Sequence, residues 1–326
     1  MRPMVRMGVL GCADIALRKV MPAMTEAGNI ELAAVASRDP AKARDVARRF
    51  GCAAADGYDG LLERADVDAV YIPLPAGLHA HWAGRALAAG KHVLAEKPLT
   101  CDHATALRLV NQARTAGLWL MENYMFLHHG QHRRVGDLVA EGRIGALRVF
   151  TARFGIPPRD ASDIRYRPEL GGGALLDVGG YPIRAAFQFL GPELDVVGSV
   201  LRMDAARGVD VAGHALLATP SGMTAELSFG FEHAYRSRYS LWGDRARLTV
   251  DRAFTPPPDR RPLIRIESAG QTEELSFPAD HQFRNITESF ARSVIQNADY
   301  APHAAAITRQ AELVDRVRAR ARLITA

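Results

Sequence analysis

Cysteine is scarce in this sequence, and its three cysteines, Cys12, Cys52 and Cys101, stand far apart with no CxxC pair among them. That scarcity argues against both a disulfide framework and a zinc ribbon. Long apolar runs are also lacking, since no stretch approaches the roughly 18 residues that a membrane-spanning helix needs. The start of the chain has basic residues before a short apolar run that enters a glycine turn, so we interpret it as a first strand and not as a signal peptide. We therefore expect a cytoplasmic protein that does not bind membranes.

The sequence also lacks a large excess of either positive or negative charge. The 41 Lys and Arg residues outnumber the 36 Asp and Glu residues, which gives a formal net charge of +5, and the sequence pI is about 9.3. This balance suits an anionic small molecule. Arginines crowd the end of the chain, but apolar residues recur between them at helical intervals, which predicts a solvated helix face or a subunit contact. No aromatic residues are interleaved with them, so we do not expect nucleic-acid binding. The arginines are Arg316, Arg318, Arg320 and Arg322, and the apolar positions are Leu313, Val314, Val317 and Ala321.

The fold class predicted from the pattern is α/β, with two domains. At 326 residues, 48% of them hydrophobic, the chain is long enough for two domains of ordinary size. Its first part alternates apolar runs with helical segments, which is typical of a doubly wound parallel sheet of the Rossmann type. We assign this dinucleotide-binding domain to residues 1–125. The expected strands are 5–10, 31–36, a short one near 53, 67–73, 91–96 and 118–125, and the expected helices are 16–27, 41–50, 59–63, 79–89 and 101–116.

A dinucleotide fingerprint is expected at the turn after the first strand. Aligned to GxGxxG, the turn supplies Gly11, Ala13 and Ala16, which are small at all three positions but include a single glycine. Gly11 would make the tight turn, and Ala13 would still let a pyrophosphate approach the helix N-terminus. The motif alone is weak, and a merely compact strand-turn-helix remains the alternative. The residues of this turn that we predict to bind the cofactor are Gly11, Cys12, Ala13, Asp14 and Ile15.

The end of the second strand indicates which dinucleotide is bound. An acidic residue there would hydrogen-bond the free 2′-hydroxyl of NAD, but this strand ends on Ser37 and Arg38. A guanidinium pairs with phosphate through charge-assisted hydrogen bonds, so these two residues favour the 2′-phosphate of NADP. Asp39 follows at once, and a shift of one residue would place it on a ribose. The sequence therefore favours NADP(H) and leaves NAD open.

Lys97 is the strongest catalytic candidate in the first domain. It ends the apolar stretch KHVLAEKP, and the carboxyl ends of parallel strands form the ligand crevice of an open α/β sheet. A lysine there polarises or protonates a carbonyl, and an X-Pro bond after it restricts the local chain and is sometimes cis. A solvent-facing lysine is the alternative. Four further residues of this edge are expected to bind the cofactor, namely Leu74, Pro75, His79 and Glu96. For His79, a packed or solvent-facing role is an equal alternative.

The second domain, assigned to residues 126–326, has a different pattern. A helix at 131–141 precedes alternating runs with Gly and Pro turns, which predict a large open, mainly antiparallel sheet in an α+β domain. An open sheet has a face that needs covering, and pairing of subunits covers it, so we expect a homodimer or homotetramer. Helices at 282–296 and 303–322 close the chain, and the last one is allowed to return to the first domain. The expected strands are 147–154, 196–203, 212–219, 223–231, 239–242 and 247–250.

A glycine-rich segment in this domain holds a second chemical pair. In GGGALLDVGGY three glycines precede a helical run that places Asp177 and Tyr181 four residues apart, on one face of a helix turn. A phenol held near a carboxylate and a lysine can donate a proton to a developing alkoxide. The alternative for Tyr181 is a buried side chain whose hydroxyl is hydrogen-bonded within the protein. The alternative for Asp177 is helix capping.

The turn GCADIA, the strand end AEKP and the segment GGGALLDVGGY together resemble the glucose-fructose oxidoreductase, inositol dehydrogenase and rhizopine-catabolism family, Gfo/Idh/MocA. The resemblance covers essentially the whole chain. It implies that Lys97 and Tyr181 are the catalytic residues at the nicotinamide and the substrate. Many dehydrogenases of the family have histidine at the second position, whereas glucose-fructose oxidoreductase and certain sugar ketoreductases have tyrosine. Further segments, at 121–132, 156–179, 229–235 and 253–257, resemble the C-3 ketoreductases of antibiotic sugars.

That subgroup implies NADPH-dependent reduction of the C-3 ketone of a dTDP-linked keto-2,6-dideoxysugar. We predict that Lys97 is the principal acid and that Tyr181 is the alternative acid or its orienting partner. Asp177 would orient the substrate or the lysine, Arg165 would meet the diphosphate or the sugar, and Tyr124 and Phe126 would line the substrate pocket. Two rival functions stay open, a dehydrogenase of a free polyol, inositol or aldose, and a regulator that senses NADP without catalysis.

A cluster of histidines follows the last strand of the first domain and is not assigned to a metal. Its members are His128, His129 and His132. No carboxylate or cysteine accompanies them in the sequence, and hydride transfer requires no metal. We therefore expect no metal site in this protein.

Overall fold

The computed structural model describes residues 4–325, and the first three residues of the segment that we interpreted as a strand start lie outside this range. The described chain forms two compact units. Unit 1 comprises Met1–Met125 with Gln282–Thr308, and unit 2 comprises Phe126–His281 with Arg309–Ala326. Among the described residues, no helix is both long and apolar enough to cross a membrane.

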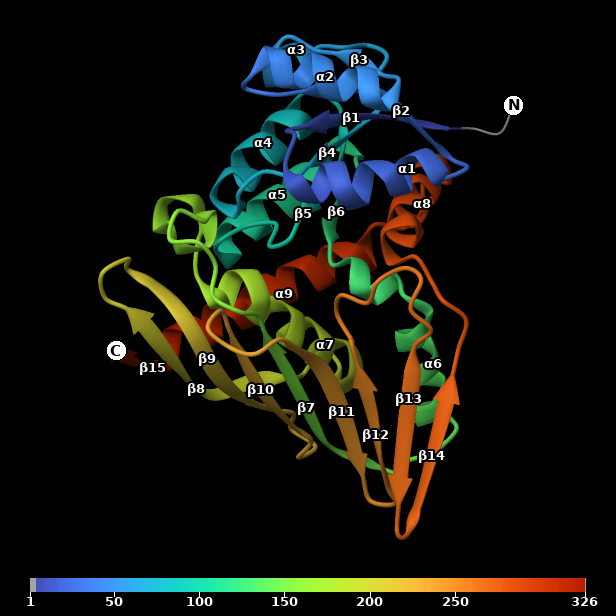
Figure 1. Ribbon diagram of the computed structural model, residues 1–326, viewed down its shortest axis with the longest axis vertical. Helices are drawn as coiled ribbons and strands as arrows, with labels where there is room; N and C mark the ends of the chain where they lie inside the picture. Colours follow the sequence, from blue (N-terminus) through green and yellow to red (C-terminus); the bar gives the residue numbers. More distant parts are fainter. Residues whose placement is uncertain (1–3, 326) are drawn as a thin grey trace. The chain divides into compact units, whose positions relative to one another are not determined.

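Unit 1 contains a parallel sheet of six strands in the order β3-β2-β1-β4-β5-β6 (Figure 1). Every strand pair in it is parallel, and the order reverses direction at β1 and β4, which is the doubly wound topology expected from the sequence. All four residues of β4 are buried, as are the last four of β1. The strands are β1 (Val5–Leu10), β2 (Ile30–Ala36), β3 (Ala53–Ala54), β4 (Ala69–Ile72), β5 (His92–Glu96) and β6 (Leu120–Asn123).

Helices connect these strands, and two of them begin at a capping side chain. Asp39 caps α2 and Asp102 caps α5, each accepting a hydrogen bond from a backbone N–H of the first turn. Both helices end on a glycine with positive φ, Gly51 and Gly117. The helices of unit 1 are α1 (Met21–Glu26), which follows a π-helical turn at Ala16–Val20, α2 (Pro40–Phe50), α3 (Gly57–Leu62), α4 (Ala76–Ala88), α5 (His103–Ala116) and α8 (Gln282–Ile295).

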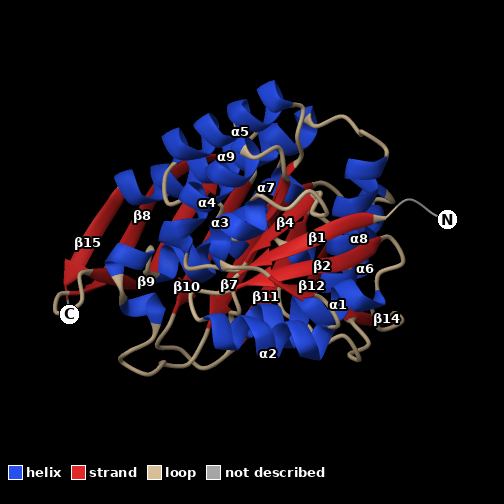
Figure 2. Cartoon of the chain, turned by 90° about the horizontal axis from the view of Figure 1, so that it is seen from above, coloured by secondary structure: helices blue, strands red, loops and turns tan. Residues whose placement is uncertain are grey.

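Unit 2 is built on a sheet of nine strands, which lie side by side from β15 to β14 (Figure 2). The order is β14-β13-β12-β11-β7-β10-β9-β8-β15, and all neighbours are antiparallel except the pairs β7–β10 and β8–β15. The strands are β7 (Leu147–Gly155), β8 (Asp195–Asp204), β9 (Val209–Ala218), β10 (Thr224–Gly230), β11 (Arg236–Gly243), β12 (Ala246–Asp251), β13 (Leu263–Ser268), β14 (Gln271–Ser276) and β15 (Ala321–Thr325).

One face of this sheet carries the helices α6 (Gly130–Ala140) and α7 (Gly180–Leu190). Buried side chains alternate along β9 to β11, and Phe150, Phe229 and Tyr239 are among the largest fully buried ones. Along the other face run polar and charged side chains with a few exposed apolar ones, of which Trp242 is 59% exposed. The unit therefore has one covered and one open face.

The last helix, α9 (Ala301–Ala319), departs from the sequence prediction at its end. We expected helix through Arg322, but Ala321–Thr325 is a strand that pairs in parallel with β8. β-branched Ile324 and Thr325 and the unpaired edge of β8 favour pairing over further helix. Leu313, Val314 and Val317 are buried as the helical spacing predicted.

Three arginines of this region, Arg316, Arg318 and Arg320, are ion-paired. Arg316 pairs with Asp195 and Glu312, each at 2.6 Å, and Arg318 pairs with Asp315 at 2.8 Å.

Strands β13 and β14 were also not expected, because their sequence follows a proline-rich loop and is largely polar.

Candidate active site

The carboxyl ends of the parallel strands bring the predicted cofactor residues of unit 1 to one edge of its sheet. Gly11 follows β1, Ser37 follows β2, Leu74 and Pro75 follow β4, and Lys97 follows β5. Because all these strands run in the same direction, the four loops share the edge at which open α/β sheets bind ligands. The sequence therefore predicted correctly that these residues belong to one edge.

The turn after β1 needs a glycine at its first position. Gly11 has a φ of 124° and a Cβ there would lie 2.8 Å from Leu74 Cδ2, so a larger residue would collide with the β4 loop. Cys12 is buried, and burial raises the pKa of its thiol. The helical segment begins right after Ala13, and the exposed carboxylate of Asp14 pairs with Arg18 one turn later at 3.2 Å. The bare backbone at Gly11 and the helix start after it fit the pyrophosphate of a dinucleotide.

The loop after β2 bears on the choice between NADP and NAD, which Asp39 left open. Asp39 Oδ1 accepts hydrogen bonds from the backbone N–H groups of Ala41 at 2.9 Å and Lys42 at 3.3 Å, so its carboxylate caps α2. Ser37 Oγ accepts the N–H of Asp39 at 3.2 Å. Arg38 is exposed, and no ion pair of its guanidinium is found among residues 4–325. A cationic fork beside a hydroxyl fits a phosphate better than a ribose diol.

Sequence reasoning missed Tyr58 at this edge. Its hydroxyl lies 3.7 Å from the position that a Cβ of Gly11 would take, and its ring contacts Trp82 edge to face with centroids 4.9 Å apart. Burial raises the pKa of Tyr58, and the nearby charge of Arg38 lowers it. The signal was available, because Tyr58 follows the short β3, whose carboxyl end points to the same edge.

Lys97 lies in a turn that is held from several sides. The Lys97–Pro98 peptide bond is cis. Just before it, Glu96 Oε1 accepts hydrogen bonds from Tyr71 Oη at 2.7 Å and Asn123 Nδ2 at 2.5 Å, which joins the ends of β4, β5 and β6. Burial raises the pKa of Glu96, and the hydrogen bond from Tyr71 opposes that rise. The Glu96 side chain thus braces the sheet, and its binding of the cofactor stays a prediction.

His79 also has its partners within the protein. Its side chain is 1% exposed, and its two ring nitrogens face backbone carbonyls, Nδ1 at 2.7 Å from Pro98 O and Nε2 at 2.6 Å from Leu74 O. Both polar atoms of the ring are thus engaged by the protein itself. The His79 side chain is thus packed at this edge, which is the alternative that the sequence left open, and its binding of the cofactor stays a prediction.

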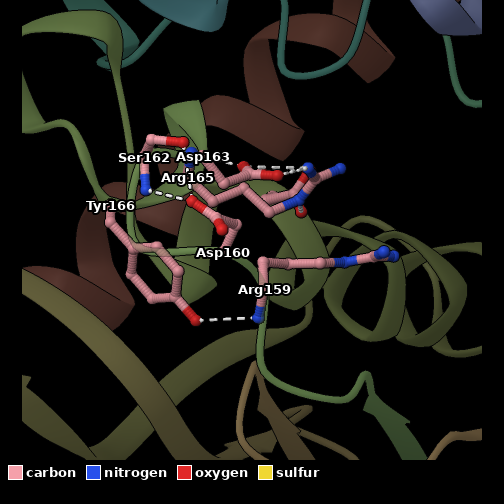
Figure 3. Close-up of polar contacts among 7 residues, drawn as sticks. Arg159, Asp160, Ser162, Asp163, Arg165 and Tyr166 are labelled. Carbon is pink, nitrogen blue, oxygen red and sulfur yellow. Dashed lines mark hydrogen bonds and ion pairs between the residues drawn. The ribbon is translucent and has the colours of Figure 1, made fainter.

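In unit 2, Asp177 belongs to a network of charged side chains with Arg165 and Asp163, and the latter two are labelled in Figure 3. Arg165 Nε donates to Asp177 Oδ2 at 2.6 Å, and its Nη1 donates to Asp163 Oδ1 at 3.1 Å. The charge of Asp177 raises the pKa of Arg165, although burial opposes it. Arg165 was predicted to meet the substrate, but two of its nitrogens bind carboxylates of its own unit. Figure 3 also shows the Arg159 guanidinium directed away from this cluster.

The ring of Tyr181 packs against three phenylalanine rings. Its ring centroid lies 5.1 Å from that of Phe154, 5.7 Å from that of Phe254 and 5.8 Å from that of Phe126. The side chain is 5% exposed. Because large rings confine it on three sides, the phenol has one fixed direction, as a proton donor or an orienting group requires. Phe126, predicted to line a pocket, is one of these three rings, and Tyr124 is buried in unit 1.

The segment that carries Asp177 and Tyr181 is a π-helical turn, Leu175–Gly179, that continues into α7. We expected a regular helix turn, with the two side chains four apart on one face. A π-turn widens the spiral and alters that relation, and such turns are frequent at functional sites.

Asp210 fixes the start of this segment, and the sequence did not point to it. Its Oδ2 accepts the backbone N–H of Leu175 at 2.6 Å, and burial raises the pKa of Asp210. Gly173 has a φ of 115°, and a Cβ there would collide with the Asp210 carboxylate. A Cβ on Gly172 would lie 2.6 Å from Arg165 O. The glycines therefore let two neighbouring segments approach the helix start.

The histidine cluster forms part of the core of unit 2. His132 Nδ1 lies 2.8 Å from Tyr239 Oη and its Nε2 lies 2.9 Å from Ala253 O, and burial lowers the pKa of His132 to about 3. His129 Nδ1 accepts the N–H of Gln131 at 3.1 Å and so caps α6. A carboxylate does accompany the cluster, since Asp280 Oδ2 is 4.0 Å from His129 Nδ1, although Asp280 is too distant along the chain for its presence to be predicted. Within residues 4–325 no group of three potential metal ligands is found.

Residues 5–124 match the model of an oxidoreductase family with an NAD-binding Rossmann fold, and residues 132–249 match the Gfo/Idh/MocA C-terminal domain. The chain belongs to the Gfo/Idh/MocA family. It is 56% identical over 294 residues to a dTDP-3,4-didehydro-2,6-dideoxy-alpha-D-glucose 3-reductase of Saccharopolyspora spinosa, which covers 90% of this chain and 89% of that protein. A reductase with the same description from Streptomyces violaceoruber is 54% identical to this chain. The match covers 98% of this chain and 96% of that reductase.

The fold also matches a solved member of the family. The 3-ketoreductase KijD10 from Actinomadura kijaniata, in complex with NADP and TDP-benzene, superimposes with a TM-score of 0.97 at 51% identity and covers 99% of both chains. Structures of KijD10 variants with a replaced tyrosine and a replaced lysine are also known. Those two residues have the same separation along that chain as Lys97 and Tyr181 have here.

Proposed function

We propose that this protein reduces the C-3 keto group of a dTDP-linked keto-2,6-dideoxysugar with NADPH, as a sugar 3-ketoreductase of antibiotic sugar biosynthesis. The observation that carries this proposal is the identity of 54 to 56% to reductases of such sugars over nearly the whole chain. We infer from the scarcity of cysteine that the reaction takes place in the cytoplasm.

NADP(H) fits the loops at the edge of the parallel sheet. The Gly11 turn and the helix start behind it would hold the pyrophosphate, and Ser37 and Arg38 would hold the 2′-phosphate. Asp39 is committed to capping α2, which supports NADP over NAD. When bound, the reduced nicotinamide supplies a hydride to the ketone carbon.

Lys97 is the principal acid in this proposal. As the ketone is reduced, negative charge gathers on its oxygen, and a protonated lysine both stabilises that charge and donates the proton. One well-placed donor at such an oxygen lowers the barrier by about 3 kcal/mol. Tyr181, whose ring is confined by Phe126, Phe154 and Phe254, is the alternative acid or the group that orients the substrate.

Asp177 and Arg165 act as a pair in this proposal. Arg165 fixes the Asp177 carboxylate through Nε, and Asp163 fixes Arg165 in turn through Nη1. Asp177 then orients the substrate or the lysine. The remaining arginine nitrogen, Nη2, is the donor we assign to the substrate's diphosphate or sugar.

We further propose that copies of this chain associate through the open face of the nine-stranded sheet. On neighbouring strands of that face, Trp242 lies between Val149 and Arg247, and Leu216 lies between Gly198 and Glu226. Trp242 is 59% exposed and Leu216 43% exposed, and solvent contact of such groups favours burial in a dimer or tetramer. Sedimentation at micromolar concentration is expected to give a dimer or a larger assembly, and a monomer would remove the proposal.

The function is tested by consumption of the reduced cofactor, with the dTDP-linked 3-keto-2,6-dideoxysugar generated in the cuvette. NADPH is expected to be oxidised rapidly and NADH much more slowly. Reduction of NADP by a free polyol or aldose, with no turnover of the keto-sugar, would replace the proposal by a polyol dehydrogenase. Tight binding of NADP without turnover of either substrate class would indicate a regulator.

A further inference from the structure

His79 occupies a place that the reaction as proposed leaves without a role. It lies in the first turn of α4, where a polar side chain would ordinarily meet solvent or a ligand, yet it is 1% exposed. Its ring lies between two backbone carbonyls from different loops, Leu74 O of the β4 loop and Pro98 O of the β5 loop. The ring therefore joins the two loops of unit 1 that flank the end of the sheet beside Lys97.

Pro98 and Leu99, the two residues after Lys97, are held on both sides. Pro98 O lies 2.7 Å from His79 Nδ1, and Leu99 N donates to Glu122 Oε1 at 2.8 Å. Before Lys97, the Glu96 side chain is bound by Tyr71 and Asn123. The main chain after Lys97 is thus fastened to α4 and β6, and the side chain of the residue before it is fastened to β4 and β6.

We propose that His79 is a positioning residue for Lys97, and that it acts through a hydrogen bond from its Nδ1–H to the carbonyl oxygen of Pro98. This inference rests on the proposed function, in which Lys97 is the acid. A lysine has a flexible four-carbon stem, so the direction of its ammonium depends on how firmly its backbone is held. Misplacement of a reacting group by about 1 Å lowers a rate by as much as about a hundredfold.

The chemistry of the ring makes the two carbonyl contacts unequal. A carbonyl oxygen accepts hydrogen bonds and donates none, so both contacts are hydrogen bonds only when the imidazole carries two protons. Burial lowers the pKa of His79, and the carbonyls of Pro98 and Leu74 oppose that shift without reversing it. At neutral pH the ring is therefore neutral, with one N–H, and the proposal assigns that N–H to the Pro98 side.

Two amide variants separate positioning from plain packing. In His79→Asn the side-chain amide nitrogen takes the place of Nδ1, and in His79→Gln it takes the place of Nε2, so each variant keeps the donor on one side. We expect His79→Asn to keep kcat within about threefold of the wild type, and His79→Gln to lose on the order of tenfold or more, with an unchanged Kd for NADPH. The melting temperatures of the two variants should fall by similar amounts. Equal kcat values in the two variants, or the reverse order, would overturn the proposal.

A second readout does not depend on the sugar. The rate at which Lys97 is acylated by a small anhydride, measured by mass spectrometry with NADP present, is expected to change in His79→Gln and to stay near the wild-type rate in His79→Asn. If the wild type fails to reduce the keto-sugar while this difference persists, the proposed function is wrong and the positioning role stands. Equal acylation rates in wild type and His79→Gln would overturn the role itself.

A third measurement needs no variant, in case both substitutions prevent folding. Neutron diffraction from wild-type crystals exchanged into heavy water at neutral pH locates the deuterons of the imidazole. The proposal expects a deuteron on Nδ1 directed at Pro98 O. A ring with its deuteron on Nε2 alone, directed at Leu74 O, would contradict it.

Discussion

At the scale of single residues, the account divides the chemistry between a lysine whose neighbours in the chain are anchored and a confined phenol. Lys97 follows a glutamate whose carboxylate is bound by Tyr71 and Asn123, and Tyr181 is enclosed by three phenylalanine rings. The residue before Lys97 and the ring of Tyr181 are held by neighbours to which this account gives no acid–base role. The two should therefore differ in what their removal does to the rate.

Replacing Lys97 by Met is expected to lower kcat by on the order of a hundredfold to a thousandfold, because the charge that stabilises the developing alkoxide is lost. Tyr181→Phe keeps the ring among the three phenylalanines and removes only the hydroxyl, so we expect a loss of about tenfold or less. Steady-state kinetics with the keto-sugar measures both. If Tyr181→Phe abolishes turnover while Lys97→Met retains it, the two roles are reversed.

Arg38 governs the choice of cofactor in this account. Arg38→Ala removes the proposed partner of the 2′-phosphate, so the KM for NADPH should rise by about tenfold or more while that for NADH stays the same. Asp39→Ala is the matched control, since it removes the cap of α2 and should cost about 1 kcal/mol of stability without changing cofactor preference. A similar change in KM for both cofactors in Arg38→Ala would show that the residue does not bind the phosphate.

Much of the edge in unit 1 could be predicted from sequence, because one rule places it. Residues that directly follow parallel strands share an edge, and this rule found Gly11, Ser37, Arg38 and Lys97. It could not find what the side chains do there, and His79 and Glu96 proved to be engaged by backbone carbonyls and neighbouring strands. Such partners are distant in sequence, so spacing carries no trace of them.

At the scale of elements, the start of α7 shows how a helix is set in place by a distant strand. Asp210 on β9 accepts the N–H of Leu175, and Gly173 leaves room for that carboxylate. The glycine motif was visible in the sequence, but Asp210 lies 35 residues along the chain from Leu175. The regular helix expected over this motif is instead a π-turn, because the motif must meet the Asp210 strand and the Arg165 loop at once.

Asp210 can be tested as the anchor of that element. Asp210→Asn keeps an oxygen that accepts the Leu175 N–H, whereas Asp210→Ala removes it and leaves a buried helix start without a cap. We expect Asp210→Ala to lower the free energy of unfolding by about 2 kcal/mol more than Asp210→Asn does, as measured by urea denaturation. It should also lower kcat more than Asp210→Asn, since the segment carries Asp177 and Tyr181. Equal stability of the two variants would refute the anchoring role.

At the scale of the whole molecule, buried histidines link stability to pH. The pKa of His132 is lowered to about 3 by burial in the core of unit 2, against about 6.5 in an unfolded chain. Between these values the unfolded state binds a proton that the folded state does not, so stability is lost as the pH falls from about 6.5 toward 3. Each pH unit within that window costs about 1.4 kcal/mol.

The variant His132→Gln removes this proton uptake. It should be less stable than the wild type near pH 7, because its contacts with Tyr239 and Ala253 are altered. Between pH 6 and pH 4, however, it should lose about 2 kcal/mol less than the wild type does. Urea denaturation followed by tryptophan fluorescence across this pH range gives both slopes. Parallel slopes for the two proteins would show that His132 is not the titrating group.

The central claim is hydride transfer from NADPH to the C-3 carbon of the keto-sugar, and isotope transfer tests it most directly. The protein is supplied with NADPH that carries deuterium on the transferable position of the nicotinamide, together with the dTDP-linked 3-keto-2,6-dideoxysugar generated in place. Mass spectrometry and NMR of the product are expected to show a single deuterium, bound to C-3 of the sugar. A product without deuterium, or with deuterium at another carbon, would contradict the account.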